Sequence, residues 1–176
     1  MKPIMPAVAF AILVATTLAP AAEAPSALGT PRSVQLEHEQ IVSRLESIAK
    51  RDGAVGIVAA KAATFLKAHY AKEEEFVLPP LGLLSAILKN PNPADLDRAV
   101  AMAERTKAAL NELLADHVEI TTLMNDLIAA GRQEQDEELV SLAGRVAAQS
   151  LNDIEVIQPT TILIGEYIRA NLHRGK

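Results

Sequence analysis

The sequence carries histidines and acids at helical spacing, and these are the residue types that hold metal ions in proteins. His69 is followed four residues later by Glu73, so on a helix the imidazole and the carboxylate lie one turn apart. Their neighbours on that face, Ala62, Phe65 and Phe76, are apolar. A buried carboxylate loses hydration on the order of several kcal/mol unless a cation or several donors replace the water. The pair therefore indicates a buried metal ligand set, although a surface ion pair has the same spacing.

A second copy of this pattern indicates an internal repeat. His38 and His117 are each followed by apolar residues at +3, +7 and +10. His69 and Gln149 are each followed by acids at +4 and +6, an apolar residue at +7 and a proline at +10. The separations also agree, because His38 and His69 are 31 positions apart and His117 and Gln149 are 32 apart. Two helical hairpins of the same design are therefore expected.

The candidate ligands come from four predicted helices and are expected to converge in one interior. They are His38, His69, Glu73, His117, Gln149 and Asp153. Imidazole nitrogen and carboxylate oxygen suit non-haem iron, manganese or zinc, whereas the absence of cysteine argues against copper(I) and iron–sulfur chemistry. His173 has no counterpart in the repeat and is expected in solvent.

Hydrophobic periodicity predicts an all-α protein. Helices are expected over residues 33–51, 55–77, 92–130 and 134–157, with a short terminal helix over 160–172. Ser33 and Asn92 are expected to cap their helices, while Pro79, Pro80 and Pro159 are expected to end the helices before them, leaving 81–88 as an apolar turn. A straight helix over 92–130 would be about 57 Å long, so a bend is expected before Leu113. The fold class is an antiparallel four-helix bundle over 33–172, built from two pseudo-repeated hairpins plus the terminal helix.

The N-terminal segment predicts export. Residues 1–21 combine Lys2, an apolar run over 7–18 and the small residues Ala19-Pro20-Ala21, a pattern typical of a secretory signal peptide. The apolar run would span about 18 Å as a helix, less than the hydrocarbon core of a bilayer at about 30 Å. A flexible leader over 22–32, a periplasmic or secreted location and no stable membrane insertion after cleavage are expected. The net charge of −5, with no basic run, argues against a nucleic-acid partner.

Four segments between about residues 34 and 163 resemble the hemerythrin-like, HHE cation-binding family. They read LEHEQIVSRL, LKAHYAKEEEFVLPPL, LADHVEITTLM and AAQSLNDIEVIQP. The resemblance implies a four-helix bundle in which each hairpin supplies histidines to one iron ion and a carboxylate from each hairpin bridges the pair. His38 and His69 would then bind the first iron, with Glu73 as a bridge. His117 would bind the second, with Asp153 as the other bridge.

The second hairpin departs from the family pattern. Gln149 stands where the resemblance implies a histidine, and Thr121 does not add the further histidine found in oxygen-carrying hemerythrins. A neutral amide is a poorer iron ligand than imidazole, so an asymmetric or single-metal site is expected.

Three functions are compatible with these residues. The first is an exported iron-binding protein, not an enzyme, that binds or senses oxygen or another small oxidant, because a 2-His-1-carboxylate set leaves coordination positions open. The second is a redox enzyme that scavenges peroxide or nitric oxide, although no proton donor stands out. The third is a metal-free structural or partner-binding bundle in which Gln149 and Asp153 hydrogen-bond to the histidines.

Overall fold

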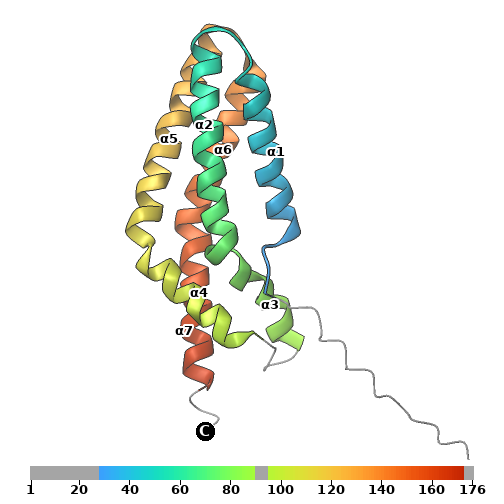
Figure 1. Cartoon of the computed structure of the whole chain (residues 1–176), viewed down its shortest axis with the longest axis vertical. Coiled ribbons are helices and arrows are strands. Elements are labelled where there is room, and N and C mark those ends of the chain that lie inside the picture. Colours follow the sequence, from blue (N-terminus) through green and yellow to red (C-terminus); the bar gives the residue numbers. More distant parts are fainter. Residues whose placement is uncertain (1–27, 90–94, 173–176) are drawn as a thin grey trace, which may run out of the picture.

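The computed structural model describes residues 28–89 and 95–172, and within these ranges every regular element is a helix (Figure 1). The elements are α1 (Arg32–Ile48), α2 (Gly53–Lys72), the π-helical segment η1 (Glu73–Val77), α3 (Pro79–Lys89), α4 (Leu96–Ala108), α5 (Leu110–Gln133), α6 (Glu137–Asn152), the π-helical segment η2 (Asp153–Ile157) and α7 (Gln158–Leu172). The all-α prediction is confirmed. The expected signal peptide, the Asn92 cap and His173 lie outside the described residues.

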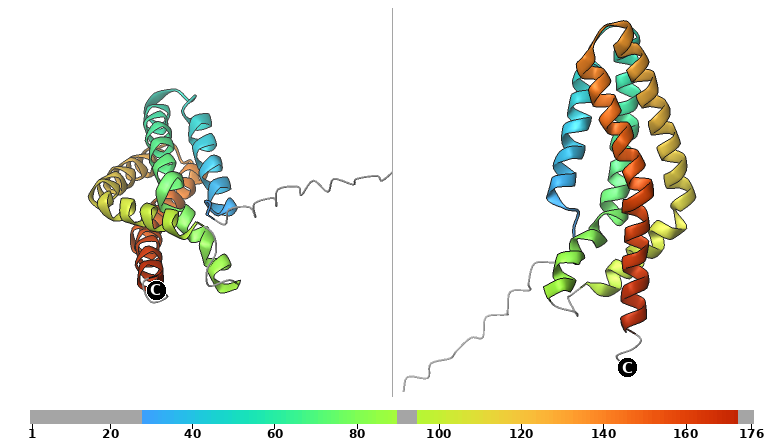
Figure 2. Two further views of the ribbon diagram at one scale, coloured as in Figure 1. Left: turned by 60° about the horizontal axis from the view of Figure 1, so that its bottom comes forward. Right: turned by 180° about the vertical axis from the view of Figure 1, so that it is seen from behind.

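The helices form two hairpins that lie side by side at one end of an elongated molecule (Figure 1). The first hairpin is α1 with α2, the second is α5 with α6, and α2 packs against α5. The loops of the two hairpins meet, because Arg51 donates to Asp136 at 2.6 Å and to Glu134. At the other end α4 packs on α7. Figure 2 shows α6 and α7 from behind as one continuous rod along the molecule.

Aliphatic side chains fill the interior between the two hairpins. The largest of them are almost fully buried: Leu45, Leu66, Met124, Leu127 and Leu139. A second cluster, with Leu83, Ala99, Ile164 and Ile168, lies between α3, α4 and α7. Burial of such side chains is the main stabilising term in folding. The first cluster therefore holds the two hairpins together, and the second holds α3, α4 and α7 together.

The predicted bend before Leu113 is confirmed. The helix axis breaks at Ala109, whose φ of −87° and ψ of 2° are not helical, and α5 begins at the next residue. The break lets α4 turn away from α5 and pack on α7. There Gly165 lies so close to Ala103 that a Cβ on the glycine would be 2.3 Å from the alanine Cβ.

The prediction that the prolines end the helices before them is confirmed at Pro79, because η1 ends at Val77 and a separate helix, α3, begins at Pro79, but it is wrong at Pro159, because α7 begins at Gln158 directly after η2. A π-helical segment precedes each proline: the Leu78 N–H donates to the Glu73 carbonyl at 2.8 Å, and the Gln158 N–H donates to the Asp153 carbonyl. Because the π-helical turn is wider, a helix can follow it at residues that lack an N–H. The expected apolar turn over 81–88 therefore belongs to α3, and α7 continues α6 without the expected stop at Pro159.

Threonine hydroxyls satisfy carbonyl groups beside the first π segment. Pro79 and Pro80 have no N–H to donate to the turn before them, and buried carbonyls need another partner. The pairs are Thr30 Oγ1 with the Glu74 carbonyl at 3.4 Å, Thr106 Oγ1 with Phe76 at 3.3 Å and Thr161 Oγ1 with Val77 at 2.6 Å. Segments far apart in sequence thus fix the start of α3.

Other features differ from expectation only locally. Ser33 does not cap α1, because the helix begins one residue earlier, at Arg32, and the Val34 and Gln35 N–H groups donate to the Pro31 carbonyl.

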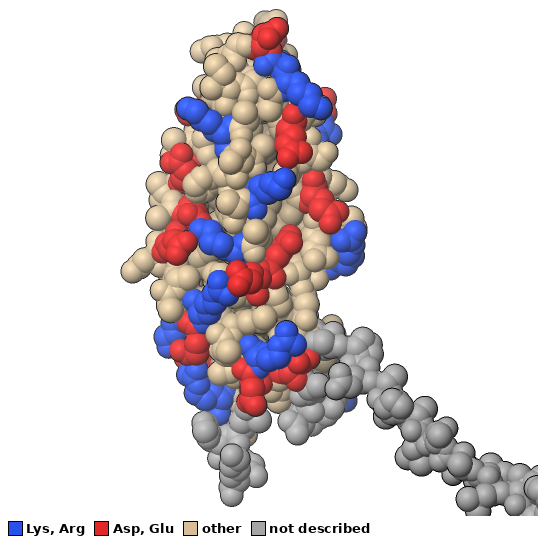
Figure 3. All heavy atoms as spheres, in the orientation of Figure 1, with Lys and Arg blue, Asp and Glu red and all other residues tan. Residues whose placement is uncertain are grey.

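No helix in the described ranges is long and apolar enough to cross a membrane. On the face drawn in Figure 3, acidic and basic side chains alternate without a large area of one sign.

Candidate metal centre

Three histidine side chains converge on one carboxylate between the helices. Glu73, at the start of η1, is fully buried, and the histidines are at most 3% exposed. The Nε2 atoms of His69 and His117 lie 3.3 and 3.9 Å from Glu73 Oε1. His38 Nε2 lies 3.9 Å from the other oxygen, Oε2. The ligand atoms of His69, Glu73 and His117 are all within 4.8 Å of one another, so these three residues could hold a metal ion.

Each histidine is held through its other ring nitrogen. The pairs are His38 Nδ1 with Glu74 Oε1 at 2.9 Å, His69 Nδ1 with Asp116 Oδ2 at 3.1 Å, and His117 Nδ1 with Ser150 Oγ at 2.8 Å. These contacts fix the ring orientations and direct each Nε2 towards Glu73. Histidines that bind metals in proteins are oriented in this way.

Several polar atoms at the centre have no hydrogen-bond partner. Within the described ranges, the fully buried atoms without one are both carboxylate oxygens of Glu73, Nε2 of His69 and Oε1 of Gln158. Buried polar atoms are nearly always paired, so a group of them in one place requires an explanation. A cation between His69 and Glu73 would supply the missing partner. The residues present therefore fit a metal ion.

The surroundings shift the pKa values of His69 and His117 in opposite directions. Burial lowers the pKa of His69, but the nearby carboxylates of Glu73 and Asp116 outweigh it, and the pKa is raised. Burial and the neighbouring His69 lower the pKa of His117 to about 4. His117 is therefore neutral near pH 7, which is the form that binds metals.

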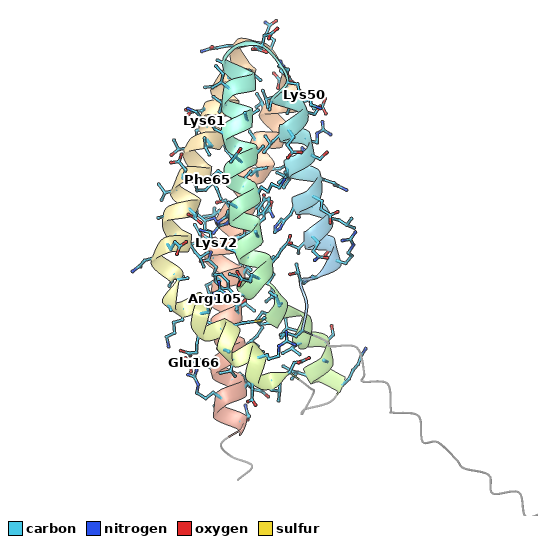
Figure 4. All side chains as sticks on the ribbon, viewed as in Figure 1. Lys50, Lys61, Phe65, Lys72, Arg105 and Glu166 are labelled. Carbon is cyan, nitrogen blue, oxygen red and sulfur yellow. The ribbon has the colours of Figure 1, made fainter. Side chains whose placement is uncertain are left out.

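Lys72 connects the centre to the surface. Its ammonium group donates to Asp116 Oδ2 at 2.5 Å, and the same oxygen contacts His69. Lys72 is labelled in Figure 4 on α2, on the side where α5 lies. Burial raises the pKa of Asp116, but its bonds to Lys72 and His69 lower the pKa overall. Asp116 therefore remains an acceptor that can hold the His69 ring.

Asp153 and Gln149 lie next to the centre but do not bond to its histidines in the described structure. Asp153 is 7% exposed, and burial, followed by the charge of Glu73, raises its pKa to about 8. Gln149 is half-buried and accepts a hydrogen bond from the Tyr70 hydroxyl at 3.4 Å. The Tyr70 ring stacks on His38 with their centroids 3.6 Å apart, and burial raises the pKa of its hydroxyl.

The grouping of the ligands differs from the one that the resemblance implies. His38 and His69 were expected on one ion and His117 on another, whereas the structure places His69 and His117 on the same oxygen of Glu73 and His38 on the other oxygen. Gln149 was expected among the ligands, but its neighbour Ser150 is the residue that contacts His117.

Residues outside the predicted set also contribute. Asp116 and Ser150 hold imidazole rings across helix interfaces, and nothing in their local sequence indicates this. Gln158 did carry a signal, because it is a lone polar residue between apolar ones, five positions after Asp153. Its side chain is fully buried beside His117.

Comparisons with protein-family models, curated proteins and solved structures found no match for this chain. The functional assignment therefore depends on the residues and their geometry.

Proposed function

We propose that this chain is a hemerythrin-like protein that holds non-haem iron and binds or senses oxygen or another small oxidant. The observation that carries the proposal is the buried Glu73 carboxylate, which has no hydrogen-bond partner and faces the Nε2 atoms of three histidines. A carboxylate costs free energy in such a place unless a cation accompanies it. Export remains a prediction from residues 1–21.

The fold that we infer is an antiparallel four-helix bundle of α1, α2, α5 and α6. It is supported by the two hairpins, by their shared aliphatic interior and by ligands that come from both. The repeat extends to the backbone, because each half has a π-helical segment that begins at a candidate acid, Glu73 or Asp153. Such segments occur often at functional sites.

The donor set supports iron, manganese or zinc, and among these we propose iron. Two imidazoles and one carboxylate would hold the ion through His69, Glu73 and His117. A non-haem iron ion bound in this way retains open coordination positions for a small oxidant. His38 and the second oxygen of Glu73 offer part of a second position, but the half-buried Gln149 adds no imidazole there. One well-held ion and a weaker second position are therefore proposed.

One contact favours the alternative of a metal-free bundle. The Gln158 amide nitrogen lies 2.8 Å from His117 Nε2, so this imidazole nitrogen has a partner without a metal. The contact provides no partner for the two oxygens of Glu73 or for His69 Nε2, which have no hydrogen bond. The form of this alternative in which Gln149 and Asp153 bond to the histidines has no support among the described hydrogen bonds. The metal-binding function therefore agrees better with the whole site.

Metal analysis with optical spectroscopy tests the proposal. The full chain is reconstituted with Fe²⁺ without oxygen, freed of excess metal, and analysed for iron per chain before and after exposure to oxygen. At least one iron per chain and an oxygen-dependent absorption change are expected. Glu73→Gln is the matched control, which keeps the side-chain shape and should lose the iron. A parent chain without bound metal would contradict the proposal, while rapid steady-state peroxide consumption would support the redox enzyme instead.

A further inference from the structure

Gln158 lies beside the metal centre, outside the ligand set proposed above. Its side chain is fully buried, and its amide nitrogen lies 2.8 Å from His117 Nε2. Its amide oxygen is also buried and has no hydrogen-bond partner. The Gln158 amide nitrogen is therefore in contact with the same His117 nitrogen that would bind an ion. The amide oxygen, which has no partner, lies beside it.

The repeat indicates that the polarity of Gln158 is not needed for folding. The equivalent residue in the first half is Leu78, which also lies five positions after the acid and directly before a proline. Both residues donate their backbone N–H to the carbonyl of that acid. Leu78 is 2% exposed, so the first half fills this position with a buried apolar side chain. A glutamine with an unpartnered oxygen costs free energy there, and this cost suggests a role in binding.

We propose that the Gln158 amide oxygen is a fourth protein ligand of the ion held by His69, Glu73 and His117. The inference rests on the proposed function, because it assigns a ligand to the same centre. The terminal torsion of a glutamine is broad and nearly two-fold, so a half-turn exchanges its nitrogen and oxygen with little displacement of the other atoms. Without metal the amide N–H donates to His117, and with metal the oxygen takes its place.

The distances at the centre can be compared with those between two atoms that bind one ion. With metal–nitrogen distances near 2.1 Å, two ligand atoms on one ion lie about 3.0–3.4 Å apart. The distance of 3.3 Å between His69 Nε2 and Glu73 Oε1 lies within this range. His117 Nε2 is closer to the Gln158 amide, at 2.8 Å, and farther from Glu73 Oε1, at 3.9 Å, so the His117 and Gln158 side chains would shift slightly to share the ion. The amide would also provide, from the start of α7, an oxygen ligand that Gln149 does not. A carbonyl-type oxygen favours iron or manganese over softer ions such as copper(I).

Titration of the full chain with Co²⁺, followed by calorimetry and visible absorption, tests the assignment. The variants are Gln158→Leu, which copies the first half of the repeat, and Gln158→Glu, which keeps an oxygen and adds a charge. Gln133→Leu makes the same chemical change at an exposed glutamine and serves as the control. We expect Gln158→Leu to weaken Co²⁺ binding about 10-fold or more, Gln158→Glu to tighten it, and the control to match the parent. Both Gln158 variants should change the Co²⁺ absorption spectrum.

The possible outcomes separate this inference from the proposed function. If the parent binds Co²⁺ and Gln158→Leu binds it equally with an unchanged spectrum, the ligand assignment is overturned while the metal centre stands. If the parent binds no Co²⁺, the proposed function fails, and this inference fails with it. Circular dichroism with chelator present shows whether Gln158→Leu folds. If it does not fold, Gln158→Glu decides, and binding no tighter than in the parent would overturn the assignment.

Discussion

Replacing His117 by alanine should remove most of the stabilisation that metal gives to this protein. His117 is 1% exposed, and its Nε2 lies 3.9 Å from the carboxylate oxygen that His69 also faces. No solvent-exposed group can take its place in the interior. His38 lies on the other oxygen of Glu73, so His38→Ala is a matched control that removes an equally buried imidazole from the same site.

The size of the effect follows from mass action. A ligand at 100 times its Kd stabilises the folded state by about 2.7 kcal/mol. Loss of a residue that only orients a metal ligand weakens binding about 10–100-fold, so loss of an imidazole ligand, which binds more strongly than a neutral amide, should weaken it by at least about 100-fold. At the same metal concentration the variant would retain about 0.4 kcal/mol. The difference, about 2.3 kcal/mol, corresponds to about 5–9 °C in Tm for a chain of this length.

Thermal melts with and without metal provide the assay. For each variant the Tm with chelator is subtracted from the Tm with Fe²⁺ under anaerobic conditions, which removes the packing cost of the substitution. His117→Ala should lose most of the metal-induced increment, and His38→Ala should keep the larger part of it. If His38→Ala loses the increment while His117→Ala retains it, the ion is held within the α1–α2 hairpin. The grouping derived from the structure would then be wrong.

Three further changes test the surroundings of the centre. Asp116→Asn should weaken metal binding about 10–100-fold by calorimetry, because Asp116 orients the His69 ring; unchanged affinity would remove it from the site. In the chelated protein Asp153 has a pKa raised to about 8, so its contribution to stability is fully present below about pH 4 and is lost as the pH rises to 8. Asp153→Asn should therefore raise the Tm by at least about 3 °C at pH 8 and less at pH 5, and an equal change at both would contradict the burial argument. Thr161→Val leaves the buried Val77 carbonyl without its hydroxyl donor and should cost about 1–3 kcal/mol in chemical denaturation, whereas no loss would show that the contact is dispensable.

The sequence predicted which residues are buried at the centre better than it predicted the path of the helices. His69 and Glu73 were placed on an inward face by their spacing, and both are buried. The proline at +10 was interpreted as a helix end, which holds at Pro79 but not at Pro159, where α7 follows η2 directly. A π-helical segment changes the direction in which its residues point, and Val156, the apolar residue seven positions after Gln149, lies within η2 and is 49% exposed.

The partners of the histidines could not be predicted, for a different reason. Asp116 contacts His69 across the interface of α2 and α5, and Ser150 contacts His117 across that of α5 and α6. Periodicity indicates which face of a helix is buried, but it does not give the rotation and height at which two helices meet. A difference of one residue in register is enough to replace the expected Gln149 by Ser150.

The most direct test of the metal centre is a crystal structure of the full chain grown with Fe²⁺ and measured at the iron absorption edge. We predict an anomalous peak within bonding distance of His69 Nε2, Glu73 Oε1 and His117 Nε2. A map from iron-loaded crystals without a peak among these three atoms, or with peaks only at surface acids, would contradict the account.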